Sequence, residues 1–245
     1  MSQNSLVPVD LSQLPSTQMF DDDVYDGIAQ SATFLARLQL YTKGKAIDKG
    51  LISPGHYGIP ESGDEITDLG VSINVLVLAR RPKAVDMSDS DAIITSYDPN
   101  SPEFKRIADK SLEKESNCMY GPSFLVIERN NWQRPLEFFC GTKSTRAEAK
   151  KIYQFLPVSA EQIKKRGLKD VEPQGPQPAM LTVRFVEKGK YSWHVPVASK
   201  CTTPFTKMLP IERLSDEIRK FCEAKTDGVE RVEEEEAPKK GKRAR

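Results

Sequence analysis

The sequence predicts a mainly β protein with three added helices and a flexible charged segment at each end. Three observations support this fold class. Short segments of alternating hydrophobicity are separated by Gly, Pro, Asn and Asp clusters, which is typical of strands joined by turns. The stretch Ile73–Met87, INVLVLARRPKAVDM, is apolar on both faces before it becomes basic, which indicates a central strand or a barrel wall. Three further segments have apolar residues at helical spacing, and two of them begin with capping residues.

The two ends of the chain differ in charge from its body. Residues 1–28 hold five aspartates and no Lys or Arg, and residues 224–245 hold seven cations against six anions. Because the formal net charge of the chain is +1, residues 29–223 carry a net charge of +5. We therefore expect an acidic flexible tail over 1–28, one folded domain over 29–223 and a disordered charged tail over 224–245.

Strands are expected throughout the first half of the domain. Residues 33–42 alternate apolar and polar side chains, and Pro99 ends the last strand of this half. Within the long strand, Pro82 should interrupt the hydrogen-bond ladder, which would place the neighbouring cations at an edge or bulge. The expected strands are 33–42, 56–59, 70–86 and 92–97.

Helices and hairpins alternate in the second half. Ser101 is a good N-cap with Pro102 behind it, and Thr145 with Glu148 forms a capping-box pattern. Two pairs of apolar segments are joined by turn residues and predict hairpins. The expected elements are a helix after Ser101, a hairpin of 123–129 and 135–141, a helix from Thr145, a short helix within 158–169, a loop at 170–178, a hairpin around the turn 187–190 and a helix at 210–223.

This order of elements suits a small antiparallel barrel of the oligonucleotide-binding (OB) type with three peripheral helices. A long central strand, a helix after it and hairpins that close behind it are the features that suit this barrel. A β-sandwich and an open α+β sheet would use the same elements.

Sequence motifs for catalysis or cofactor binding are absent. There is no glycine-rich phosphate loop and no G-x-S-x-G, and the four cysteines lack C-x-x-C spacing. Asp21–Asp23 are expected to be a solvated run, and His194 to be structural or exposed. A nuclease would need a rigid carboxylate cluster, for which Glu128 and Glu137 are the candidates on ordered elements. We therefore expect no enzyme activity, no metal and no cofactor.

Free thiols indicate a reducing compartment. The first twenty residues lack the basic start and apolar run of a signal peptide, and the longest apolar stretch, Val75–Ala79, is too short to span a membrane. These features predict a cytoplasmic protein without a membrane partner.

Cations interleaved with aromatic residues favour the binding of single-stranded nucleic acid, because phosphates need positive charge and unpaired bases need flat side chains. Tyr191 and Trp193 alternate with polar residues, a pattern shared by core and stacking residues. The candidates for phosphate contact are Arg37, Lys43, Lys45, Arg80, Arg81, Lys83, Arg184, Lys188 and Lys190. The candidates for base stacking are Tyr41, Tyr57, Trp132, Tyr191 and Trp193.

Residues 30–222 resemble a bacteriophage single-stranded-DNA-binding protein of the OB-fold type. The resemblance lies in TFLARLQLYTKGKAIDKGLISPGHYGI, INVLVLARRPKAVDM and CMYGPSFLV. It implies a protein that coats and protects single-stranded DNA in viral replication and recombination in the host cytoplasm. The chain departs from such families by ending in KKGKRAR after its acidic run.

Further partners are open from sequence alone. The charged tails could recruit replication proteins or occupy the protein's own cationic surface, and self-association is compatible with the pattern. The alternative function is a structural or scaffolding virion component that does not bind nucleic acid.

Overall fold

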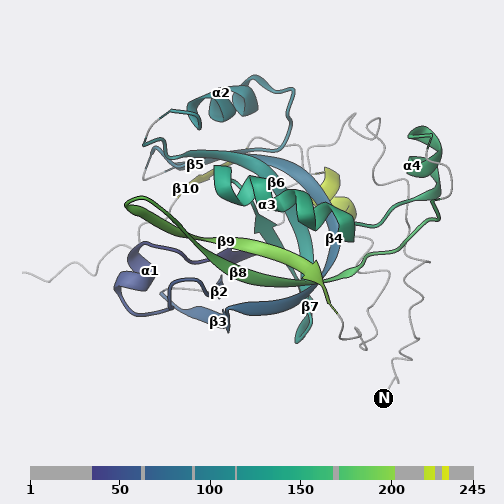
Figure 1. Cartoon of the computed structure of the whole chain (residues 1–245). Helices are drawn as coiled ribbons and strands as arrows, with labels where there is room; N and C mark the ends of the chain where they lie inside the picture. Colours follow the sequence, from purple (N-terminus) through teal and green to yellow (C-terminus); the bar gives the residue numbers. More distant parts are fainter. Residues whose placement is uncertain are drawn as a thin grey trace, which may run out of the picture.

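The computed structural model describes residues 35–61, 64–89, 92–113, 115–167, 171–201, 218–223 and 228–231, and the fold is mainly β (Figure 1). The described strands all join one sheet. They are β1 (Ala36–Leu40), β2 (Tyr57–Pro60), β3 (Ile66–Gly70), β4 (Ser72–Asp86), β5 (Ala92–Ser96), β6 (Cys118–Glu128), β7 (Asn131–Phe139), β8 (Pro178–Lys188), β9 (Tyr191–Lys200) and β10 (Gly228–Arg231).

Strand β4 organises the sheet, whose order is β10-β5-β4-β6-β7-β1-β2-β3 with the β8–β9 hairpin branching from β4. One edge of β4 pairs with β6 over most of its length. Its other edge pairs first with β8, where Ile73 lies opposite Leu181, and then with β5, where Val85 lies opposite Thr95. All these pairings are antiparallel, whereas β1 and β7 run parallel, so the sheet is mixed.

The expected closed barrel of the OB type is not confirmed, because the described sheet is not closed. Two strands share one edge of β4, so the sheet branches there instead of continuing around a single ring. The sheet does curl, since the Tyr57 hydroxyl of β2 donates a hydrogen bond to the Thr182 carbonyl of β8 at 3.0 Å. A side chain makes this contact, where a barrel would have a ladder of backbone hydrogen bonds.

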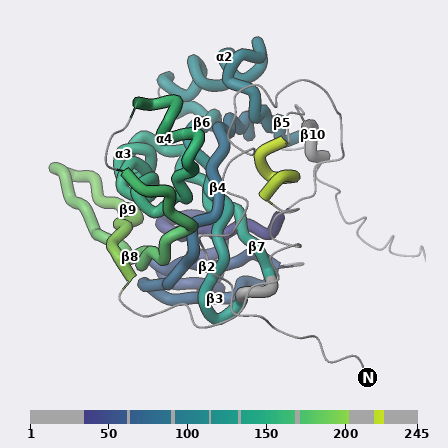
Figure 2. Tube along the Cα trace, turned by 90° about the vertical axis from the view of Figure 1, so that its right-hand side faces the viewer, coloured from purple at the N-terminus to yellow at the C-terminus, as the bar shows by residue number. Residues whose placement is uncertain are grey.

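Both faces of β4 are covered, as its two-sided hydrophobicity predicts. Val75 and Val77 pack into the larger core together with α3, and Leu76 and Leu78 pack into a second cluster with the helix 218–223. Figure 2 shows this helix in yellow on the opposite side of β4 from α3. The protein therefore has three layers, with β4 in the middle one.

A β-bulge changes which side chains of β4 share a face. The register with β6 shifts between Val77 and Ala79, so Ala79 joins Leu78 in the second cluster. The prediction that Pro82 interrupts the ladder is wrong, because Pro82 lies directly opposite Pro122 within the paired strands. The Pro122 carbonyl accepts from the Cys140 amide, so it points away from β4. The two prolines thus form a pair that needs no N–H between the strands.

The described helices are α1 (Lys45–Asp48), α2 (Pro102–Lys110), α3 (Lys143–Ile152), the 3-10 helix η3 (Tyr153–Phe155) and α4 (Ala160–Lys165), and residues 218–223 are also helical. Helix α2 begins as predicted, since the Ser101 hydroxyl accepts from the Phe104 amide at 3.1 Å. The capping box predicted at Thr145 and Glu148 is wrong. Thr142 is the N-cap of α3 and Thr145 completes the box, which leaves Glu148 free for other contacts.

Some segments differ from the expected loops and tails. Helix α1 lies between the expected strands 33–42 and 56–59, where no helix is expected, and β8 begins at Pro178, the last residue of the expected loop. Strand β3 is not among the strands expected from the sequence, and Gly70, at φ 77°, separates it from β4. Strand β10 lies in the predicted C-terminal tail and pairs with β5. The acidic tail 1–28 and most of the helix at 210–223 lie outside the described residues.

Candidate nucleic-acid interface

The basic stretch of β4 does not present its three cations to solvent together. Beyond the bulge, Arg80 lies on the face of the larger core and is exposed. Arg81 and Lys83 lie on the opposite face, where their exposed fractions are 9% and 4%. The prediction that Arg81 and Lys83 contact phosphates is wrong, because both side chains are buried.

Glu137 of β7 is the reason for this burial. Its carboxylate accepts hydrogen bonds from Arg81 Nη2 at 2.8 Å, from Lys83 Nζ at 2.6 Å and from the Ser123 hydroxyl at 2.8 Å. Burial alone would raise the pKa of Glu137, but the two cations outweigh it and hold this pKa at about 2. Burial also lowers the pKa of Lys83, against the opposing effect of Glu137. These groups form a buried ionic cluster.

The cluster also fixes the helix 218–223. The Arg81 guanidinium lies between the rings of Tyr97 and Phe221, 3.7 Å and 4.1 Å from their centroids, and Nη1 donates to the Phe221 carbonyl at 3.1 Å. Phe221 itself is part of the second core cluster. Arg81 and Lys83 therefore join β4, β7 and the C-terminal helix, which is a structural role.

The other predicted residues near β4 differ in exposure. Arg80 lies over the ring of Tyr153 at 4.6 Å and is available to solvent. Arg37 is half-buried and close enough to Lys83 to lower the pKa of that lysine. Tyr57 has no exposed surface, so its prediction as a stacking residue is wrong. Trp132 belongs to β7 and not to the predicted turn, and its side chain lies outside the described part.

The β8–β9 hairpin projects beyond the rest of the sheet. Its ladder runs from Ala179–Lys200 to Lys188–Tyr191, whereas pairing with β4 ends at Thr182. The distal half of the hairpin therefore has no third strand beside it among the described residues. Figure 1 shows this half as an arm extending past β2.

Aromatic and cationic side chains gather on this arm. Tyr191 is 65% exposed and Phe185 is 53% exposed, and Trp193 is half-buried. Cross-strand partners share a face, so Tyr191 and Lys188 lie on one face with Trp193, and Phe185 lies on the other. Lys188 and Lys190 are exposed, and Lys190 Nζ lies 5.5 Å from the centroid of the Tyr191 ring. Arg184 is less available, since it donates to Glu148 at 2.6 Å.

The segment between β1 and β2 lies against the arm. The His194 ring packs at a tilt against Phe185, with 5.0 Å between the ring centroids, and covers Gly55, where an added Cβ would lie 2.9 Å from the His194 ring. The same segment carries the exposed Lys43 and Lys45. The structure thus brings Lys43, Lys45, Lys188, Lys190 and the exposed rings onto neighbouring elements.

Two further residues of this region complete the surface. Tyr41 is half-buried, its ring packs over Gly58, and burial raises its pKa. His56 contacts the Asp68 carboxylate at 2.9 Å through Nδ1.

Phe185 and His194 were not among the predicted site residues. The sequence signal that could reveal them is the length of the alternating hairpin. Its strands β8 and β9 continue beyond the part of β8 that pairs with β4.

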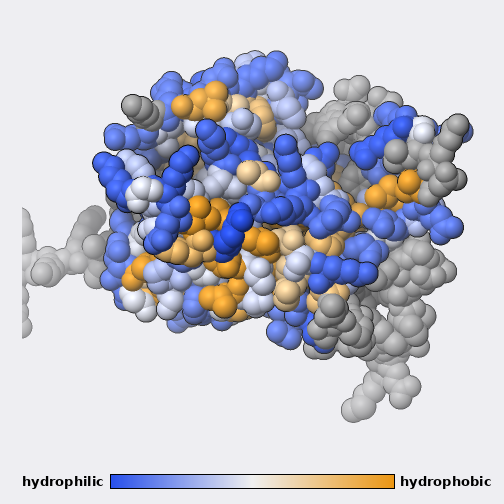
Figure 3. Space-filling view, in the orientation of Figure 1, coloured by the Kyte–Doolittle hydropathy of each residue, from blue (hydrophilic) through white to orange (hydrophobic). Residues whose placement is uncertain are grey.

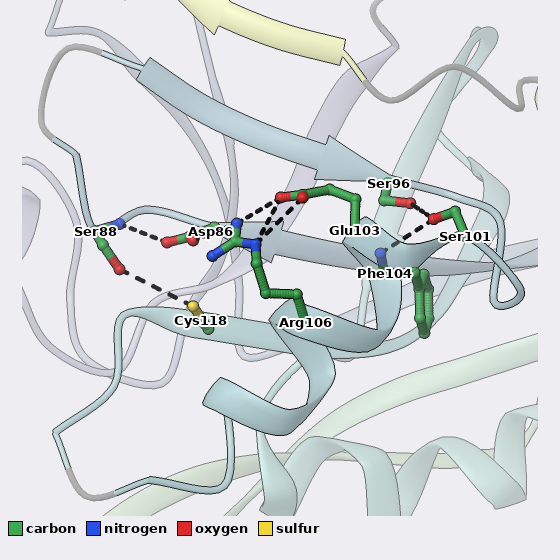
Figure 4. Close-up of polar contacts among 8 residues, drawn as sticks. All are labelled: Asp86, Ser88, Ser96, Ser101, Glu103, Phe104, Arg106 and Cys118. Atoms are coloured by element: carbon green, nitrogen blue, oxygen red, sulfur yellow. Dashed lines mark hydrogen bonds and ion pairs between the residues drawn. The ribbon is translucent and has the colours of Figure 1, made fainter.

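A second polar cluster surrounds Asp86 at the end of β4 (Figure 4). Arg106 of α2 donates to Asp86 at 2.8 Å and also contacts Glu103, and the Ser88 amide donates to Asp86 at 3.0 Å. The Cys118 thiol lies beside Ser88. Burial raises the pKa of this thiol, and the nearby Asp86 carboxylate raises it further. A thiol held protonated is a poor nucleophile, which argues against catalysis at Cys118. Because Arg106 links α2 to Asp86 of β4, the cluster anchors α2 to the sheet.

The described residues offer no group of three metal-ligating side chains. Glu137 is committed to Arg81 and Lys83, and Glu128 accepts from the Asn130 amide, so these two acids do not form a shared carboxylate site. None of the described helices is long and apolar enough to cross a membrane.

No protein-family model, curated protein or solved structure matches this chain. The evidence for function is therefore the geometry of the arm and of the elements beside it.

Proposed function

We propose that this protein binds single-stranded DNA without catalysing a reaction on it. The binding surface is the distal half of the β8–β9 hairpin together with the segment between β1 and β2. A protein of this kind would coat and protect single strands during viral DNA replication or recombination.

The observation that supports this proposal best is the exposure of Tyr191 and Phe185 beside lysines. Burying one large aromatic side chain stabilises a fold by about 1.5–3 kcal/mol. Two exposed rings on one arm therefore leave out several kcal/mol of folding stability that their burial would provide. Bases stack on exposed rings with about 1–3 kcal/mol each, while neighbouring cations contact phosphates. Lys188 ends β8 directly opposite Tyr191, and Lys190 lies in the turn just before Tyr191.

The spacing on β9 also suits stacking. Tyr191 and Trp193 are two residues apart on one face, which corresponds to about 6.8 Å along a strand. Stacked bases lie about 3.4 Å apart, so one base fits between two such rings. The face therefore offers a stacking site that is indifferent to base identity.

Fluorescence anisotropy of labelled oligo-dT at two salt concentrations tests the proposal. We expect submicromolar binding that weakens steeply with salt. Tyr191→Ala should weaken binding about 5- to 150-fold, which corresponds to the loss of one stacked base. Leu112→Ala is the control, since Leu112 is an exposed apolar residue in the turn after α2.

A double variant tests the phosphate contacts. Lys188→Ala with Lys190→Ala should lower the salt slope by up to about 1.4 for a single strand. Lys105→Ala with Lys110→Ala removes the same charge from α2 and should leave the slope unchanged. Absence of binding at low salt, or equal effects of both double variants, would refute the proposal.

A further inference from the structure

A second cationic surface lies beside the arm. Residues 143–166, which include α3, η3 and α4, contain seven Lys and Arg against two Glu. Their net charge is +5, which equals the net charge of all residues from 29 to 223. The positive charge of the domain is therefore concentrated in this one segment, which we call the basic helical layer. Its cations are Lys143, Arg146, Lys150, Lys151, Lys164, Lys165 and Arg166.

The basic helical layer adjoins the arm in space. Helix α3 contacts β9, and Glu148 of α3 bonds Arg184 of β8 at 2.6 Å. Figure 1 shows the distal end of the hairpin on the left, α3 in the centre and α4 on the right of one face. Arg80 adds an exposed cation where its guanidinium lies over Tyr153. In the same orientation, Figure 3 shows hydrophilic side chains over α3 and a hydrophobic patch over the hairpin.

The layer differs from the arm in lacking exposed rings. All the exposed large hydrophobic side chains of the described residues lie outside 143–166, and those of the arm are Phe185 and Tyr191. The buried face of α3 carries Ala149 and Ile152, which pack into the core. Cations without rings can contact phosphates but cannot stack on bases. A helix whose apolar face is buried in the protein also lacks the face that would insert into a membrane.

We infer that the basic helical layer binds the phosphate backbone of a duplex arm next to the single strand held by the hairpin. The preferred ligand is then a junction between single- and double-stranded DNA. This inference rests on the proposed function, since the hairpin supplies the single-strand half of the site. Duplex DNA carries one negative charge per about 1.7 Å of axis, so a surface that contacts only phosphates gains most from a duplex. Helix α3 spans about 15 Å of that charge.

Anisotropy with three labelled probes tests the inference: a single strand, a blunt duplex and a duplex with a single-stranded overhang. The overhang probe should bind at least about tenfold tighter than the single strand at 0.1 M salt, because two added duplex contacts raise the salt slope by about 1.8. Lys150→Ala with Lys164→Ala should remove this advantage and leave single-strand affinity within about twofold. Lys105→Ala with Lys110→Ala on α2 is the control and should leave the advantage intact.

The outcomes separate this inference from the proposed function. Equal affinity for overhang and single strand, or equal losses on both probes in the Lys150 and Lys164 variant, overturns the inference and leaves single-strand binding standing. Binding to duplex without any binding to the single strand overturns the proposed function and the junction with it. Vesicles of phosphatidylserine and phosphatidylcholine provide the last arm. Binding to these vesicles that depends on Lys150 and Lys164, with no overhang advantage, would assign the layer to a membrane surface and overturn the inference.

Discussion

Replacing Glu137 by glutamine tests whether the basic stretch of β4 serves the fold. Glu137 is buried and is the carboxylate shared by Arg81 and Lys83. Its pKa falls from an ordinary 4.5 to about 2, which corresponds to a stabilisation of about 3 kcal/mol at neutral pH. Glutamine keeps the shape but leaves two buried cations without a counter-charge. Breaking a buried pair in this way costs about 3–5 kcal/mol, so Glu137→Gln should lower the free energy of unfolding by that amount.

Urea denaturation at a series of pH values measures this effect. A carboxyl group with a lowered pKa in the folded state stabilises the protein above its unfolded pKa, and the stabilisation is lost as the pH falls through the folded pKa. The wild-type protein should therefore lose about 3 kcal/mol from Glu137 between about pH 4.5 and pH 2, and Glu137→Gln should lack this part of the loss.

A glutamate whose cation partners are exposed provides the control for this experiment. Glu148→Gln removes a carboxylate that also contacts two cations, Arg184 and Lys151, but both of these cations are exposed. Its effect should stay below about 1 kcal/mol. A loss below about 1 kcal/mol in Glu137→Gln, or an acid transition equal to that of the wild type, would refute the structural role of the cluster.

Three further substitutions probe the supports of the candidate interface. Gly55→Ala should lower the free energy of unfolding in urea by more than Gly50→Ala does. Both glycines have positive φ, but only at Gly55 would the added Cβ meet a side chain, the ring of His194. Equal losses would contradict the packing of the arm on the segment between β1 and β2. Phe221→Ala should cost about 3–5 kcal/mol and increase hydrogen exchange in the helix 218–223, and unchanged exchange would show that Phe221 does not anchor it. Ser101→Ala should cost about 1 kcal/mol by removing the N-cap of α2, and a thermal melt within 1 °C of the wild type would contradict that.

Local patterns in the sequence predict much of the strand and helix content but little of how the elements combine. The two-sided apolar pattern of β4 and the Ser101 cap depend on neighbouring residues only, and both are confirmed. The branching of the sheet at β4 depends on which strands reach its second edge, and pairs of residues about a hundred positions apart decide that. Such pairings have no local signature, so closure of the sheet could not be judged from the sequence.

The two groups of predicted phosphate contacts show the same limit. Arg80, Arg81 and Lys83 form the densest basic stretch inside an apolar strand, yet two of them are buried. Burial depends on Glu137, more than fifty residues away, and on the bulge at Val77 that sets which face each cation occupies. Charge counting along a strand cannot distinguish a cation that meets solvent from one that meets a buried carboxylate.

The exposure of the arm has a geometric cause. Alternating apolar and aromatic residues on a hairpin usually pack into a core, and Val195, the next residue after Trp193 on that face of β9, does so. The pairing of β8 with β4 ends at Thr182, so residues closer to the turn extend past the sheet that would cover them. An arm with exposed rings is prone to aggregation unless a partner covers it or charge protects it, and here Lys188 and Lys190 lie at the turn. The same features that keep the arm soluble, rings beside cations, are those that a single strand of DNA requires, so the length mismatch between β8 and β4 is what creates the candidate interface.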